Sequence, residues 1–191
     1  MAIGGAAIGI ICYVLYAPYA KFQRAEKELA DLKETLKPRI TVSYSEDDEQ
    51  CRLPPRPTGM PLFRVNTHLG EGELVTNVIA RVQAIRKDGK KLPLLEPVRL
   101  RFHSSGPSGE LETMRPGTSE PLDMFRLDGS GLSLALAYNY EAFDHHCCND
   151  PSHTYEIDVS ISSSIVRTEF TFVCPWTGDF NTTEPYIKQP S

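Results

Sequence analysis

The sequence predicts a mainly β protein, in which an N-terminal transmembrane helix and a short heptad stalk precede an antiparallel β-sandwich of about seven or eight strands. Three observations lead to this prediction: an uncharged first segment, a regular apolar spacing directly after it, and apolar–polar alternation through the rest of the chain. Hydrophobic residues make up 40% of the 191 residues and charged residues 24%, which is typical of a folded domain and not of a disordered chain.

Residues 2–20 are predicted to form a single transmembrane anchor because they contain no charged residue. Nineteen helical residues extend about 28 Å, close to the thickness of a bilayer core. A cleaved signal peptide is the competing interpretation, but no basic residue precedes the apolar run, and Pro18 occupies the first small position of a cleavage site. Lys and Arg follow the segment and none precedes it, so we expect the large C-terminal part in the cytoplasm, with the extracytoplasmic side as the alternative.

Residues 21–38 are predicted to form a juxtamembrane helix that ends before Pro38. Apolar residues in this segment recur at alternating intervals of three and four, the spacing of a heptad seam. The segment is either a short coiled coil that supports weak homo-oligomerisation or a solvated helix. The seam consists of Phe22, Ala25, Leu29, Leu32 and Leu36.

Residues 39–186 are predicted to form the β-sandwich, and residues 187–191 a flexible tail. The segment 46–61 is acidic and then proline-rich, so we expect a loop there. Turn signals such as Asp88-Gly89 and Asp128-Gly129 separate the alternating segments. The predicted strands are 39–44, 62–67, 78–84, 98–102, 121–127, 132–138, 155–161 and 168–173.

The order of several motifs resembles small bacterial single-pass membrane-anchored proteins that carry an immunoglobulin-like β-sandwich and have no assigned function. The motifs are KPRITV, FRVNTHLGEGELVTNVIARV, MRPGTSEPLDMF and HTYEIDVSI, which fall within roughly residues 39–173. The resemblance implies an immunoglobulin-like fold and no catalytic residue. A cysteine- and histidine-rich insertion at residues 145–149 departs from the pattern.

This insertion contains His145, His146, Cys147 and Cys148, whose side chains are of the types that bind zinc. Three interpretations remain open: a metal site, a disulfide from Cys147 or Cys148 to Cys51 or Cys174, and reduced thiols in an exposed loop. We favour the third, because adjacent side chains diverge and the paired spacing of a structural zinc site is absent.

A second candidate is a basic segment at residues 81–101, which carries seven basic and two acidic residues in a chain whose net charge is −5. It is either a contact surface for anionic lipid or an acidic partner, or an ordinary solvated sheet face. Few aromatic residues lie among these charges, so we do not expect nucleic-acid binding. The basic residues are Arg81, Arg86, Lys87, Lys90, Lys91, Arg99 and Arg101.

The sequence contains no serine-hydrolase elbow, phosphate-binding loop, dinucleotide fingerprint or zinc-protease motif. We therefore expect no enzymatic activity and no cofactor. The predicted function is that of a membrane-tethered β-sandwich that acts as a structural or interaction module for a protein partner. The alternative is a metal- or redox-responsive module that uses residues 145–148.

Overall fold

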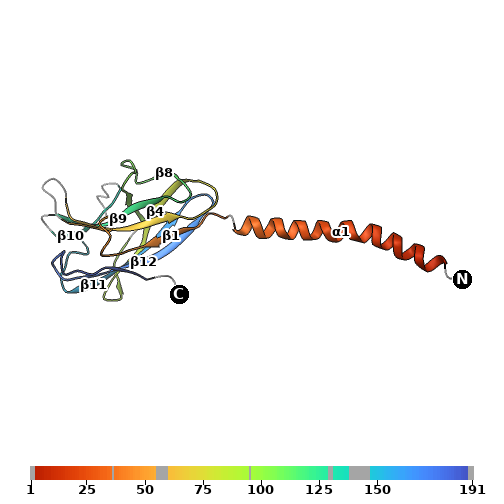
Figure 1. The fold of residues 1–191 in the computed structure, drawn as a ribbon. Coiled ribbons are helices and arrows are strands. Elements are labelled where there is room, and N and C mark those ends of the chain that lie inside the picture. The colour runs from red at the N-terminus through yellow and green to blue at the C-terminus, as the bar shows by residue number, and fades with distance from the viewer. Residues whose placement is uncertain are drawn as a thin grey trace. The chain divides into compact units, whose positions relative to one another are not determined.

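The computed structural model describes residues 3–35, 37–54, 60–94, 96–128, 131–137 and 147–188, with backbone alone for residues 3–17, 35 and 128. The chain divides into two compact units, Met1–Lys37 and Pro38–Ser191. The first unit contains a helix and the second contains the strands (Figure 1).

Helix α1 (Ile3–Thr35) is one continuous element that includes Pro18. In the part of the chain that the structure describes, no helix is long and apolar enough to cross a membrane. This finding contradicts the transmembrane anchor predicted at residues 2–20, and with it the single-pass membrane localisation and the cytoplasmic topology. The physical reason is that a spanning helix needs about 20 predominantly apolar residues, whereas residues 2–20 include three glycines, three tyrosines and Pro18.

The predicted coiled coil also lacks support, because α1 is the one helix among the described residues. A heptad seam is buried only when a second helix covers it. The seam side chains Phe22, Leu29 and Leu32 are all more than half exposed, and Leu36 lies outside the described residues. Homo-oligomerisation through these residues stays an untested prediction.

The prediction of a mainly β protein is confirmed, since two antiparallel sheets make up the second unit. The first sheet has the order β1 (Ile40–Ser43), β3 (Leu62–Leu69), β9 (Ser119–Asp128), β10 (Gly131–Leu134), with β2 (Arg52–Leu53) paired to β3 and β7 (Arg101–Phe102) to β9. The second has the order β13 (Tyr186–Lys188), β12 (Arg167–Trp176), β11 (His153–Ser162), β4 (Val75–Lys87), β5 (Lys90–Lys91), with β6 (Val98–Arg99) and β8 (Leu111–Met114) paired to β4. Residues 187 and 188, expected in the tail, pair with β12.

One hydrophobic core contains side chains from both sheets. Alternate residues of a strand point to the same face, and in β11 the buried apolar residues are Tyr155, Ile157, Val159 and Ile161. Phe125 of the first sheet lies with its ring centroid 6.0 Å from that of Phe172 in the second. The two sheets are therefore packed face to face, as in a β-sandwich. The more specific immunoglobulin-like topology stays a prediction.

The start of β4 is irregular. Asn77 has a positive φ of 55°, and it interrupts the pairing with β8, which joins Val75 to Met114 and Val78 to Leu111. The register is the same on both sides of Asn77, so its left-handed backbone breaks the ladder locally without inserting a residue. At this irregular end of the second sheet, β8 approaches the start of β9 in the first sheet.

Candidate functional site

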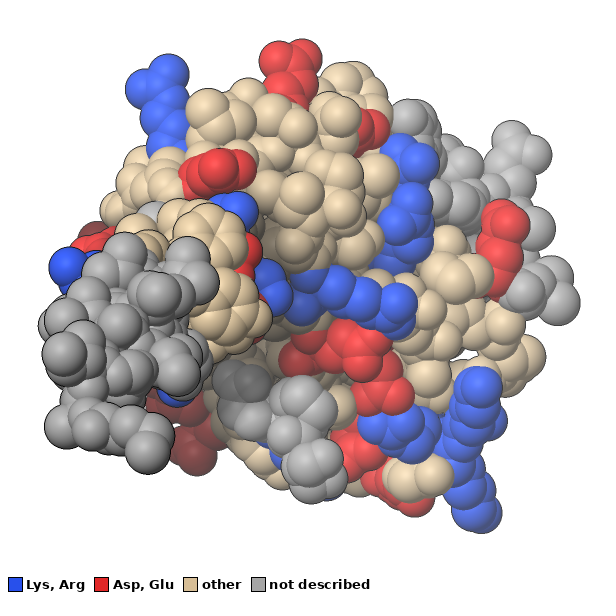
Figure 2. Space-filling model, turned by 90° about the vertical axis from the view of Figure 1, so that its right-hand side faces the viewer, with Lys and Arg blue, Asp and Glu red and all other residues tan. Residues whose placement is uncertain are grey.

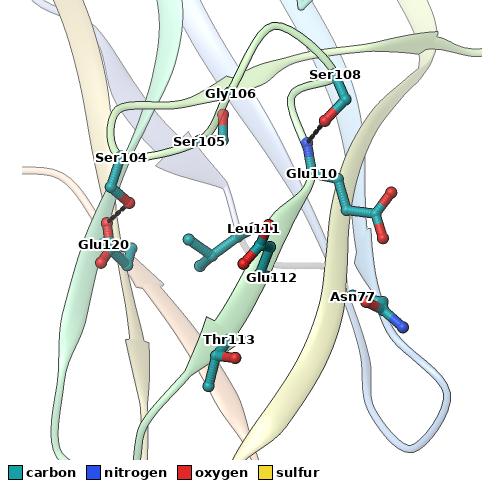
Figure 3. Close-up of a pocket in the computed structure, with 10 residues that line it drawn as sticks. All are labelled: Asn77, Ser104, Ser105, Gly106, Ser108, Glu110, Leu111, Glu112, Thr113 and Glu120. Carbon is teal, nitrogen blue, oxygen red and sulfur yellow. Dashed lines mark hydrogen bonds between the residues drawn. The ribbon is translucent and has the colours of Figure 1, made fainter.

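An open polar cleft of about 920 Å³ lies beside β8. One side is formed by β8 and the other by the segment after β7 together with the beginning of β9 (Figure 3). Every lining residue except Gly106 and Leu111 has a polar side chain. The lining residues are Asn77, Ser104, Ser105, Gly106, Ser108, Glu110, Leu111, Glu112, Thr113 and Glu120.

The segment between β7 and β8 is held in place by hydrogen bonds within it. The backbone N–H and the hydroxyl of Ser105 both donate to the carbonyl oxygen of Phe102, at 3.1 and 2.7 Å. The N–H of Gly109 donates to the Gly106 carbonyl oxygen at 3.0 Å. A bonded segment of this kind presents its side chains in a defined arrangement, which a binding site requires.

Gly109 brings this segment against the body of the sandwich. Its φ is +69°, and a Cβ atom at this position would lie 2.3 Å from the Ala137 Cβ and 2.6 Å from the Leu100 carbonyl oxygen. Only glycine fits a left-handed conformation with so close an approach. The position of the adjacent Glu110 in the cleft wall therefore depends on Gly109.

Three glutamates, Glu110, Glu112 and Glu120, give the cleft its charge. Glu112 is exposed and the other two are half-buried. The Ser104 hydroxyl donates a hydrogen bond to Glu120 Oε2 at 2.6 Å, and none of the three carboxylates forms an ion pair with a described residue. None of the described residues that line the cleft is Lys or Arg. The cleft is therefore suited to a cationic group that also forms hydrogen bonds.

The cleft also contains an edge strand. Among the described strands, β8 pairs with β4 alone. Figure 3 shows β4 on one side of β8 and the cleft residues Ser104 and Glu120 on the other. The outer backbone groups of an edge strand are available to pair with an added strand. The cleft thus offers both carboxylates and strand backbone to a ligand.

The predicted basic segment is divided between the two sheets and is partly neutralised. Arg86 of β4 donates to Glu156 Oε2 at 2.8 Å and to both Asp158 carboxylate oxygens at 2.6 Å. These hydrogen bonds raise the pKa of Arg86 above its ordinary value. Lys87 Nζ lies 2.5 Å from Asp150 Oδ2. On the face shown in Figure 2, Lys and Arg side chains lie beside Asp and Glu side chains.

Six of the seven basic residues lie on β4 and its paired neighbours in the second sheet. Arg81 is opposite Arg99 of β6, Arg86 is opposite Lys91, and Lys87 is opposite Lys90 of the exposed strand β5. Arg101 lies on β7, in the first sheet, opposite Asp123. The fold thus brings six of the seven residues together and separates Arg101, and an interaction surface at these residues stays a prediction.

The four described cysteines of the sandwich are Cys51, Cys147, Cys148 and Cys174, and none is in a disulfide. Cys147 Sγ lies 3.7 Å from Cys148 Sγ. Cys174 is fully buried in the core, and burial raises the pKa of its thiol to about 12. His145 and His146 lie outside the described residues, and no group of three or more metal-binding side chains occurs among the described ones.

Sequence reasoning did not identify the cleft residues. Glu110 and Glu112 stand two positions apart after the serine- and glycine-rich segment 104–109, which is the one local signal of a polar site. Glu120 comes from the other sheet, and its proximity depends on the fold. Comparison of the chain with models of known protein families, with curated proteins and with solved structures found no match.

Proposed function

We propose that the protein is a non-catalytic interaction module that binds a basic, extended segment of a partner protein in the cleft beside β8. One observation carries this proposal: a single open cleft contains both an edge strand and three glutamates that form no ion pair with a described residue. Either feature alone is common on protein surfaces. Together they match a known mode of peptide recognition, in which a segment adds to a sheet edge and neighbouring side chains select its sequence.

The contacts divide between affinity and specificity. Main-chain hydrogen bonds to the outer edge of β8 provide sequence-independent binding, each contributing about 0.5–1.5 kcal/mol. The glutamates select Lys or Arg and discriminate against acidic segments, because like charges in a cleft repel. Leu111, which is almost fully buried, supplies an apolar surface within the polar lining.

The size of β8 limits the affinity. Its four residues extend about 14 Å, so a partner segment makes direct strand pairing over roughly four or five residues. So small an interface is typical of weak, transient complexes. We therefore expect dissociation constants in the micromolar range and a strong decrease of affinity with ionic strength.

A binding role is favoured over catalysis by the composition of the cleft. The described part of its lining contains no His, Cys or Lys. The Ser104 hydroxyl donates to Glu120, but no lining side chain is placed to act as a neutral base of the type that activates a serine nucleophile. The lining supports hydrogen bonding and charge complementarity.

The proposal is tested by binding of a fluorescent lysine- and arginine-rich peptide, with a glutamate-rich peptide as reference. We expect Glu112→Lys to weaken binding of the basic peptide about tenfold or more, equivalent to about 1.4 kcal/mol. Glu184→Lys is the matched control, because it makes the same charge change at an exposed position between β12 and β13, outside the cleft. An equal loss in both variants would indicate a non-specific charge effect, and no preference for the basic peptide would refute the proposal.

A further inference from the structure

Cys147 and Cys148 place two sulfur atoms in contact at the edge of the core. Their Sγ atoms are 3.7 Å apart. Cys148 is completely buried within the hydrophobic cluster, whereas Cys147 is half-buried and packs against it. One thiol is therefore accessible from outside, and the second lies directly behind it.

The residues after this pair are anchored to three strands. The indole N–H of Trp176 donates to the Asn149 carbonyl oxygen at 3.2 Å, and the backbone N–H of Leu132 donates to Asn149 Oδ1 at 3.0 Å. The Tyr155 hydroxyl donates to the Asp150 carbonyl oxygen at 3.0 Å. These bonds hold the C-terminal side of the pair, so the two thiols are kept close together by the fold.

The other two described cysteines of the sandwich lack an accessible sulfur neighbour. Cys51 and Cys174 are buried, as Cys148 is, but neither has its sulfur in contact with another described sulfur. Burial raises the pKa of both thiols, which suppresses the thiolate form that reacts with oxidants. Any thiol chemistry of the described sandwich is therefore expected first at the adjacent pair.

We propose that Cys147 and Cys148 are a redox-active vicinal dithiol that small-molecule disulfides oxidise to a reversible Cys147–Cys148 disulfide. In the first step the Cys147 thiolate attacks the oxidant RSSR, forms a mixed disulfide and releases one thiolate RS⁻. In the second step the Cys148 thiolate attacks the Cys147 sulfur and releases the second RS⁻. Two cysteine thiols lose two electrons and two protons, and RSSR is reduced to two RSH.

The geometry favours a reversible modification over a structural crosslink. Adjacent Cα atoms are about 3.8 Å apart, whereas disulfides usually join Cα atoms about 4.4–6.8 Å apart. A bridge between neighbours is thus strained and easily reduced, as labile regulatory disulfides are. This inference is independent of the proposed peptide binding at β8.

The test uses the full chain treated with oxidised glutathione and then alkylated after denaturation. We expect two fewer alkylated cysteines than the five in the sequence, the loss of two hydrogen atoms in mass, and a Cys147–Cys148 link in the peptide map. Full alkylation, glutathione retained on the unmutated protein, or a link to Cys51, Cys174 or a second copy would overturn the proposal.

Two further measurements separate this chemistry from a folding effect. In Cys148→Ala the resolving thiol is missing, so we expect glutathione to accumulate on Cys147. Trp176 is the single tryptophan of the sequence and bonds to the residue after the pair, so its fluorescence is expected to change on oxidation and to recover on reduction. If Cys148→Ala fails to fold, the unmutated protein is treated with phenylarsine oxide, which condenses with two adjacent thiols and releases water. The bound arsenic is expected to protect Cys147 and Cys148 from later alkylation. Alkylation of both cysteines despite this treatment would contradict the proposal.

Discussion

Substitution of Gly109 by alanine tests how the cleft segment is held against the sandwich. The left-handed backbone costs a residue with a Cβ atom about 1–2 kcal/mol. The new methyl group would also lie 2.6 Å from the carbonyl oxygen of Leu100, a backbone atom that cannot rotate away. Overpacking of this kind costs about 1–3 kcal/mol. The combined loss of about 2–5 kcal/mol corresponds to a decrease in Tm of roughly 5–20 °C for a domain of this size.

Thermal unfolding followed by circular dichroism measures this effect, and two glycines of the same unit serve as controls. Gly106 lies in the same segment with no atom within 4 Å of the added Cβ, so Gly106→Ala is expected to change stability by no more than about 0.5 kcal/mol. Gly117 has a φ of +73° and open space, so Gly117→Ala isolates the backbone cost of about 1 kcal/mol. If Gly109→Ala unfolds at the temperature of Gly106→Ala, the close approach to Leu100 and Ala137 is wrong.

Two other predictions concern stability. Burial alone would raise the pKa of Asp158, but hydrogen bonds from Arg86 and Thr171 outweigh it and hold the pKa below its ordinary value. A lowered folded-state pKa stabilises the protein above the unfolded pKa of about 3.9, and this contribution is lost as pH falls through the folded pKa. Below about pH 4, the Tm of Asp158→Asn should therefore depend less on pH than the Tm of the unmutated protein does. The same pH dependence of Tm in both proteins would contradict this. A chain that begins at Pro38 should keep its β circular dichroism and a Tm within about 2 °C of that of the full chain, because every residue of the hydrophobic core lies after Pro38. A large decrease in Tm would show that α1 stabilises the sheets.

The sequence was sufficient to locate most of the strands. Each of the eight segments predicted from apolar alternation overlaps a strand. The alternation is visible because one face of each sheet is buried, as in β11, where Tyr155, Ile157, Val159 and Ile161 alternate with less buried residues. The prediction failed where burial does not alternate. In β8 the two outer residues are buried and the two inner ones exposed, so Leu111–Met114 has no period of two.

The helix and the charged segment show why charge content alone is a weak guide. Lack of charge in residues 2–20 predicted a transmembrane anchor, but the described part of the chain contains no helix that is long and apolar enough to span a membrane. Within the basic segment, Arg86 pairs with Glu156 and Asp158, which lie 70 and 72 positions away in sequence. Partners so distant become neighbours through the pairing of β4 with β11, which local sequence patterns do not reveal.

Binding at β8 is tested most directly by titrating the isotope-labelled protein with the basic peptide and following backbone amide resonances. The proposal predicts chemical-shift changes confined to residues 104–113, Asn77 and Glu120. It also predicts slower hydrogen exchange for outward-facing amides of β8, because those groups gain hydrogen bonds when a strand is added. Shift changes centred elsewhere in the sandwich, or an unchanged spectrum at millimolar peptide, would contradict it.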